Sequence, residues 1–97
     1  RSAGDLVLAK VLLGSPLQTL ADDKKELEVR GSTIDEVVGE LARRYPELNK
    51  KLLTPGGTLS YSVLIYLDGR NVRTADREQA PVKESSVIQI FPVVGAG

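Results

Sequence analysis

The chain has 97 residues, of which 41% are hydrophobic and 27% charged, a composition typical of one small globular domain. Its 13 lysines and arginines balance its 13 aspartates and glutamates, so no net field favours binding to nucleic acid or an anionic membrane. It has no cysteine and no histidine, which excludes disulfides, thiolate metal sites, cysteine nucleophiles and histidine bases. We therefore expect no metal site and no catalytic activity from this chain alone. No apolar run approaches the ~20 residues that span a bilayer, and we expect a cytoplasmic protein.

The first predicted strand covers residues 5–14, DLVLAKVLLG. If Lys10 points to solvent, the strand period of two places Leu8 and Leu12 on the same outer face. The alternate positions then point into the core: Val7, Ala9, Val11 and Leu13.

A second strand is predicted at residues 25–29, KELEV, with Leu27 and Val29 inward. The two strands would form a hairpin joined by a polar loop around Pro16. The pair Asp22–Asp23 at the end of that loop is followed by two lysines, and we interpret it as a turn signal rather than a metal site. The PGG stretch at 55–57 is also a turn signal, because it lacks the lysine of a phosphate-binding loop.

The strongest local pattern is STIDEVVGELARRYPEL, which predicts a helix over residues 33–45. Thr33 and Glu36 have the spacing of a capping box. Pro46 is expected to end the helix, because the residue before a proline is disfavoured in helical geometry. Apolar residues at spacings of three and four form one stripe: Ile34, Val37, Val38, Leu41, Ala42 and Tyr45.

Two further segments complete the predicted sheet. YSVLIYLDGRNVR contains a strand, the hairpin signal Asp68–Gly69 and a short strand, and SSVIQIF supplies the last strand. A helix after the first hairpin must cross one face of the sheet, which predicts an α+β roll of four or five strands. The expected core consists of Val11, Leu27, Val29, Ile34, Val38, Leu41, Ile65, Leu67, Ile88 and Ile90.

This order of elements resembles the ubiquitin-like β-grasp fold, and the ending VIQIFPVVGAG resembles that of the MoaD/ThiS family of sulfur carriers. The family's last strand runs into Pro-x-Val-x-Gly-Gly, so Pro92, Val94 and Gly97 match without a gap. YLDGRNVR and GSTIDEVVGELARRYPELNKKLL are also similar to stretches of that family. The resemblance covers residues 6–97. It is strongest for the small subunit of molybdopterin synthase and the carrier of a thiocarboxylate-dependent cysteine pathway.

The resemblance implies that Gly97 is the reactive residue and that the chain carries sulfur without being an enzyme itself. An adenylating (E1-like) partner would use ATP to activate the Gly97 carboxylate, and sulfur transfer would give a thiocarboxylate. The acceptor would be a synthase of molybdopterin, cysteine or thiamin type, or the molybdopterin synthase large subunit. Neither nucleic acid nor membrane is an expected partner, and no cofactor is expected to bind. One position departs from the family: Ala96 stands where the family has glycine.

The tail predicted to enter the partner comprises Val93, Val94, Gly95, Ala96 and Gly97. Pro92 has no backbone N–H, so we expect strand pairing to end near Phe91 and the tail to be mobile. Residues 1–5 are expected to be a disordered or tag-derived start, 6–92 the β-grasp domain, and 93–97 a flexible tail. The head is expected to dock through apolar side chains on the open face of the sheet, where an exposed patch usually marks an interface: Phe91, Tyr66, Leu64, Leu8 and Leu12.

Two alternatives remain open from the sequence. Gly97 could be joined to a target lysine, as in a ubiquitin-like protein modifier. The chain could instead be a β-grasp interaction domain whose tail is inactive, which Ala96 would favour.

Overall fold

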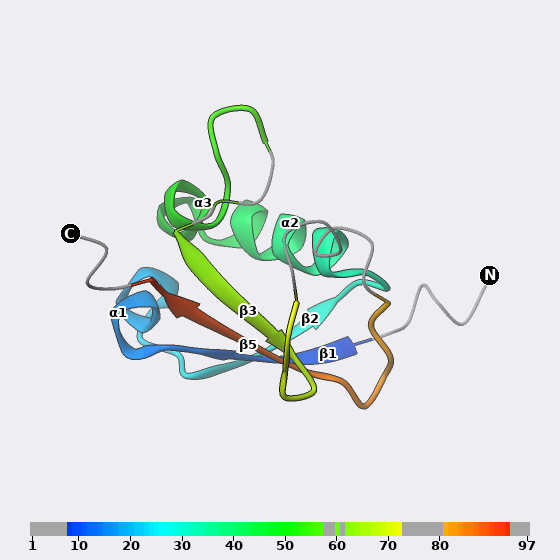
Figure 1. The fold of residues 1–97 in the computed structure, drawn as a ribbon. Helices are drawn as coiled ribbons and strands as arrows, with labels where there is room; N and C mark the ends of the chain where they lie inside the picture. The colour runs from blue at the N-terminus through cyan, green and yellow to red at the C-terminus, as the bar shows by residue number, and fades with distance from the viewer. Residues whose placement is uncertain (1–7, 58–59, 61, 73–80, 94–97) are drawn as a thin grey trace.

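The computed structural model describes residues 8–57, 60, 62–72 and 81–93. Over these residues the strands form one mixed sheet in the order β2-β1-β5-β3-β4, with helices packed on one face (Figure 1). The predicted α+β roll with a helix across the sheet is confirmed. The elements are β1 (Leu8–Leu13), α1 (Ser15–Gln18), η2 (Thr19–Ala21), β2 (Glu26–Arg30), α2 (Ile34–Arg44), α3 (Pro46–Leu52), β3 (Val63–Leu67), β4 (Arg70–Asn71) and β5 (Val87–Pro92).

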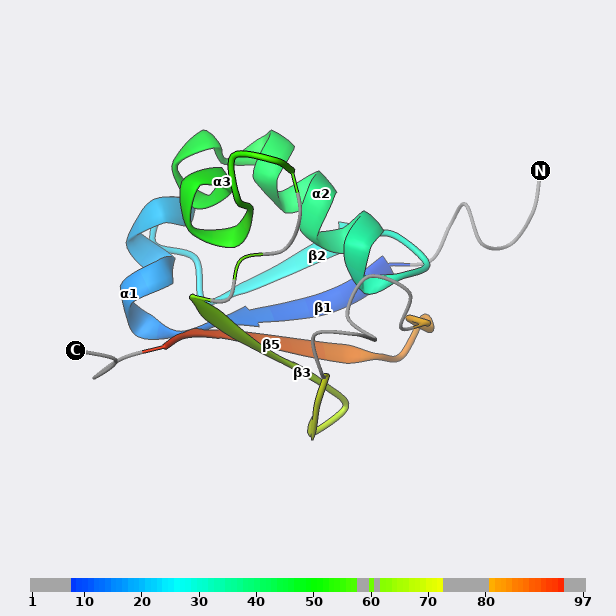
Figure 2. The ribbon, with the colours of Figure 1, turned by 45° about the horizontal axis from the view of Figure 1, so that its top comes forward.

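The central strand β5 lies between the first hairpin and the second. β1 pairs with β2 in antiparallel and with β5 in parallel orientation, and β3 pairs in antiparallel orientation with both β4 and β5. The parallel pairing of the first and last strands requires a crossover, and α2 and α3 lie on that path. Figure 2 shows α2 and α3 above the sheet and α1 at one end of it.

Helix α2 begins with the predicted cap at Thr33, whose hydroxyl accepts a hydrogen bond from the Glu36 N–H at 3.1 Å. The return contact differs from the expected capping box. The Glu36 carboxylate accepts hydrogen bonds from the N–H and the hydroxyl of Ser32, both at 2.8 Å, instead of from the Thr33 N–H. These bonds, first the one from the Ser32 N–H, hold the pKa of Glu36 below its usual range. The helix ends at Arg44, before extended Tyr45 and then Pro46, which starts α3.

The core lies between the sheet and the helices. Nine of the ten residues expected there are buried, and the exception is Leu67, which is only partly buried against the core near the end of β3. Glu36 and Glu40 stay outside the core, as the predicted helix register requires. Helix α3 adds two fully buried leucines, Leu48 and Leu52.

The connection between β1 and β2 is more ordered than the loop expected from the sequence. It contains α1, with Pro16 in its first turn, and then η2. Asp22 and Asp23 follow with left-handed φ values of 55° and 62°, which supports the interpretation as a turn. Within the described ranges, no three His, Cys, Asp or Glu side chains gather into a group that could hold a metal ion. The second hairpin turns at Asp68 and Gly69, both with positive φ, as a type I′ turn requires.

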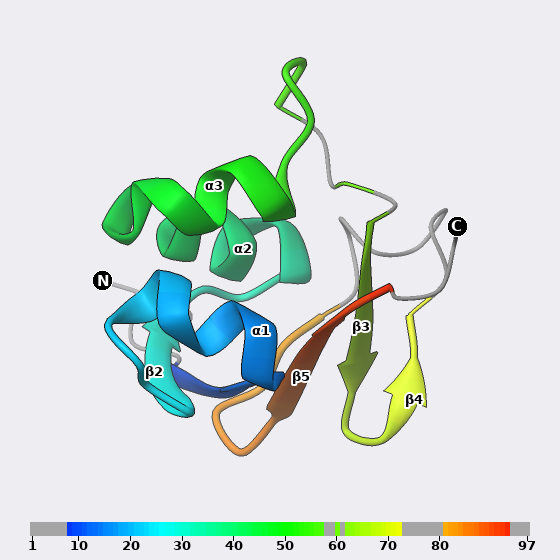
Figure 3. The same ribbon diagram turned by 90° about the vertical axis from the view of Figure 1, so that its left-hand side faces the viewer.

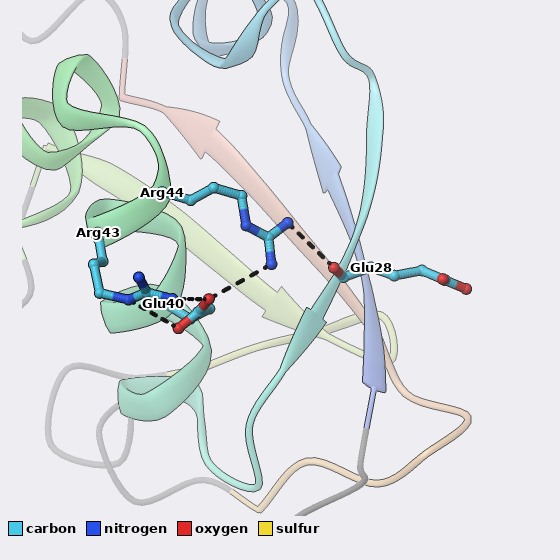
Figure 4. Close-up of polar contacts among 4 residues, drawn as sticks. All are labelled: Glu28, Glu40, Arg43 and Arg44. Carbon is cyan, nitrogen blue, oxygen red and sulfur yellow. Dashed lines mark hydrogen bonds and ion pairs between the residues drawn. The ribbon is translucent and has the colours of Figure 1, made fainter.

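A guanidinium group joins α2 to the outer edge of the sheet (Figure 4). Arg44 donates a hydrogen bond to the backbone carbonyl of Glu28 in β2 at 3.4 Å, and it pairs with the Glu40 carboxylate at 3.7 Å. Arg43 binds the same carboxylate, and this hydrogen bond is the main reason that the pKa of Glu40 lies below its usual range. The cluster thus holds the end of the helix against β2. In the part of the chain that the structure describes, no helix is long and apolar enough to cross a membrane.

Candidate functional site: the open sheet face and the tail root

The helices leave the opposite face of the sheet open, and strand pairing gathers four of the predicted docking side chains there. Leu12 of β1 pairs with Gln89 of β5, which pairs with Tyr66 of β3. In the next row, Phe91 pairs with Leu64. We call Leu12, Leu64, Tyr66 and Phe91 the apolar cluster. All four are partly buried.

The two aromatic residues of the apolar cluster contact each other. The Tyr66 and Phe91 rings meet edge to face, with centroids 6.0 Å apart and planes inclined by 70°. This geometry is favoured by the ring quadrupoles. The contact shapes the cluster before any partner is bound.

Leu8 lies apart from the apolar cluster although it shares the open face. It begins β1, before the first residue that pairs with β5, and Lys10 stands between it and Leu12. The Lys10 ammonium group pairs with Glu26 at 3.6 Å. Leu8 is 41% exposed, the largest exposed fraction among the big hydrophobic side chains of the described chain.

Two carboxylates border the apolar cluster on its β2 side. Glu26 is opposite Leu12 and Glu28 is opposite Lys10, and both are exposed. Directly opposed residues of an antiparallel pair share a face, so both glutamates lie on the open face. The alternation in KELEV predicted that both glutamates point outward. The position of Glu26 beside Leu12 depends on how β1 pairs with β2, which the alternation does not give.

The tail root, which we define as Pro92 and Val93, differs from the sequence prediction. Strand β5 runs through Pro92, and the Val93 N–H then donates to the Ser62 carbonyl at 2.9 Å. Pairing therefore continues on the β3 side for one to two residues beyond Phe91, near which it was predicted to end, and Val93, predicted to begin the free tail, is hydrogen-bonded. No motif in the sequence marks Ser62 as a partner of the tail.

Pro92 fits into the strand because its nitrogen faces the side where no donor is needed. Alternate residues of β5 bond to β3 and to β1: Val93 bonds to Ser62, whereas the Ile90 carbonyl accepts from Gly14 N–H at 2.8 Å. Pro92 therefore faces β1, which has already turned into α1. The Gly14 carbonyl, the next acceptor on that side, instead accepts from the N–H groups of Leu17 and Gln18 in α1. Figure 3 shows α1, the end of β5 and the start of β3 at the same end of the sheet.

The predicted tail residues beyond the root, Val94, Gly95, Ala96 and Gly97, lie outside the described residues. Val93 is described, and its side chain is 37% exposed. The described part of the site therefore consists of the apolar cluster and the tail root.

A comparison with known protein families identifies the chain. A model of the ThiS family matches residues 11–97, almost the whole sequence. The chain belongs to the ThiS family. The match includes the tail as well as the β-grasp head.

Individual relatives agree with this assignment. The Archaeoglobus fulgidus protein named "Putative sulfur carrier protein" is 28% identical over 72 residues, which are 74% of this chain and 82% of that protein. The solution structure of small archaeal modifier protein 1 from Methanosarcina acetivorans superposes with a TM-score of 0.84 at 28% identity, over 94% of this chain and 97% of that one. A chain of the BexX/CysO complex of Amycolatopsis orientalis gives a TM-score of 0.79 at 24% identity, over 92% and 99% of the two chains, and shows the shared ubiquitin-like fold.

The relatives of this ThiS family member thus include one protein named as a putative sulfur carrier and one named as a small archaeal modifier. Several of the predicted docking residues lie together on its open face, and a strand-paired root leads to its tail.

Proposed function

We propose that this ThiS family member is a sulfur carrier whose C-terminal glycine, Gly97, becomes a thiocarboxylate. The observation that carries the proposal is the family match through the last residue, because the tail is the reactive part of such a carrier. The chain acts as a co-substrate, or as the small subunit of a complex such as molybdopterin synthase.

The chemistry requires two displacements. A carboxylate is a poor electrophile, so a Gly97 oxygen first attacks the α-phosphorus of ATP in an adenylating partner, and pyrophosphate leaves. Sulfur from a donor then attacks the acyl carbon, and AMP leaves with the electrons of the broken carbon–oxygen bond. The terminal sulfur is ionised at neutral pH and attacks an activated carbon in the acceptor enzyme. ATP and the acid–base groups for these steps belong to the partners, and the acceptor enzyme serves a molybdopterin, cysteine or thiamin pathway.

The apolar cluster is the proposed contact surface for the adenylating enzyme. Its aromatic side chains supply large contact areas at small entropic cost, as hot-spot residues of interfaces do. The neighbouring Glu26 and Glu28 outnumber Lys10 at this edge, and so favour a partner whose rim is basic beside the apolar contact. Electrostatic complementarity of this kind speeds association and sets specificity.

A second function is favoured by one comparison. The similarity to small archaeal modifier protein 1 supports attachment of Gly97 to a lysine of a target protein. Both functions begin with adenylation, and they separate only when either a sulfur donor or an amine attacks the acyl carbon.

Adenylation tests the shared first step. The chain, ATP and the cognate adenylating enzyme should give pyrophosphate exchange, and deletion of Gly97 should abolish it. The deletion should leave the thermal midpoint of the head unchanged. Pyrophosphate exchange that persists after deletion of Gly97 would contradict the proposal. An intact chain that gives no pyrophosphate exchange would also contradict it.

A further inference from the structure

Ser62, which accepts the hydrogen bond from Val93, is itself held by a small hydroxyl network. Its N–H donates to the Ser60 hydroxyl at 3.0 Å, and the two hydroxyl oxygens are 2.7 Å apart. The Ser62 hydroxyl also donates to the Lys51 carbonyl at 3.3 Å, and the Ser60 N–H donates to the Leu52 carbonyl at 2.8 Å. The acceptor of the tail root is therefore tied to the C-terminal end of α3.

The opposite side of β5 is held two residues before the tail root, at the end of β1. The Gly14 N–H donates to Ile90, and a Cβ on Gly14 would lie 3.0 Å from the Phe91 ring and 3.2 Å from the Pro92 ring. A side chain at this position would displace one of these rings. Glycine thus allows the end of β5 to approach the start of α1 closely, while the hydrogen bond to Ser62 restrains the root on the β3 side.

A restrained root limits where the end of the chain can reach. Four residues follow Val93 in the sequence, and a fully extended chain of four spans at most about 14 Å. If pairing ended at Phe91, six residues would be free, with a reach of about 20 Å. A shorter connection limits the positions that the chain end can reach, which favours its alignment with a reaction centre.

We propose that Ser62 is a positioning residue for the activation of Gly97. Its backbone carbonyl accepts from the Val93 N–H, and its hydroxyl fixes that carbonyl to Ser60 and Lys51, so that the tail starts from one point on the head once the sheet face is docked. The inference rests on the proposed function and deepens it. Ser62 is not part of the apolar cluster, and its bond is to Val93, four residues before Gly97 in the sequence. We therefore expect its effect in the rate of adenylation within the complex and not in the affinity of the complex.

The test compares Ser62→Ala with Ser85→Ala, a matched loss of a hydroxyl in the exposed turn before β5. Amide hydrogen exchange of Val93 in the free protein reports the tether. Single-turnover adenylation at saturating adenylating enzyme reports positioning, and titration reports affinity. Ser62→Ala keeps the carbonyl that accepts from Val93 but removes the hydroxyl contacts that fix it to Ser60 and Lys51. We expect this variant to speed Val93 exchange and to slow adenylation by about 2- to 10-fold, the range of one lost hydrogen bond. The dissociation constant should change less than about twofold.

Ser85→Ala should match the wild type in all three measurements, and Ser62→Thr, which keeps the hydroxyl, should restore the adenylation rate. An unchanged rate in Ser62→Ala, with an active wild type, would overturn the positioning role alone. A loss that appears only in the dissociation constant would also overturn it, because Ser62 would then be a docking residue. A wild-type chain that is not adenylated would contradict the proposed function itself, and the positioning role with it.

Discussion

The ring of Tyr66 in β3 meets the ring of Phe91 in β5 edge to face, with 6.0 Å between the centroids. The two residues are diagonal neighbours across paired strands, since Phe91 lies opposite Leu64 and Tyr66 lies opposite Gln89. The contact ties the open face of the sheet to the residue that precedes the tail root.

The first prediction concerns the strength of this aromatic contact. In a double-mutant cycle of Tyr66→Ala and Phe91→Ala, the coupling in the free energy of unfolding should be about 0.5–1.5 kcal/mol. Chemical denaturation of the four proteins gives the value. A coupling near zero would mean that the two rings pack independently in solution.

The second prediction concerns the docking face. Phe91→Asp places a carboxylate within the apolar cluster and should weaken binding to the adenylating enzyme by about tenfold or more, as loss of a hot-spot residue does. Because Phe91 is partly buried and packs on Tyr66, this change should also lower the thermal midpoint measurably.

Leu8→Asp is the matched control, since it puts the same charge on the same face outside the apolar cluster. We expect a small effect on both affinity and thermal midpoint, because Leu8 is 41% exposed. Equal weakening by the two variants would show that the interface extends along all of β1.

The sequence predicted features that arise from local contacts. The capping hydroxyl of Thr33 and the apolar stripe of α2 lie within one helix, and the alternation in β1 and β2 sets which side chains face the core. The family assignment also followed from a contiguous ending. These features depend on residues that are near one another in the chain.

The features that the sequence did not reveal depend on pairing between distant segments. The separation of Leu8 from the apolar cluster follows from where β5 starts to pair with β1. The bond from Val93 to Ser62 depends on the register of β3 against β5, and Ser62 has no distinctive sequence context. Proline lacks a backbone N–H, and this alone predicts that the strand ends at Pro92. The sequence does not show which side of the strand the Pro92 nitrogen faces.

The third prediction concerns pH and the cap of α2. The pKa of Glu36 is lowered in the folded state, mainly by the hydrogen bond from the Ser32 N–H. A lowered pKa contributes stability above the carboxyl's unfolded pKa, and that stability is lost as the pH falls through the folded value. Glu36→Gln should therefore lower the thermal midpoint at neutral pH, and the difference from wild type should vanish in acid.

Thermal melts of both proteins from neutral pH to below about pH 3 measure this convergence. Ser32→Ala, which removes only the hydroxyl donor, should show a smaller difference that converges in the same direction. A difference that grows in acid would contradict the assignment of the ionised Glu36 as the stabilising form.

The fourth prediction concerns Ala96, where the family has glycine. The alanine methyl group restricts the backbone and adds bulk where the tail would pass through the partner's channel. Ala96→Gly should raise the rate of adenylation and leave the thermal midpoint of the head unchanged. Initial rates of pyrophosphate exchange measure the effect, and an unchanged rate would show that the channel accepts alanine.

Intact mass spectrometry of the chain after incubation with ATP, a sulfur donor and the cognate adenylating enzyme tests the central claim most directly. The account predicts a mass gain equal to the difference between a sulfur and an oxygen atom, located on Gly97 and absent when Gly97 is deleted. An unchanged mass despite adenylation, or a mass that corresponds only to conjugation with another protein, would contradict the sulfur-carrier function.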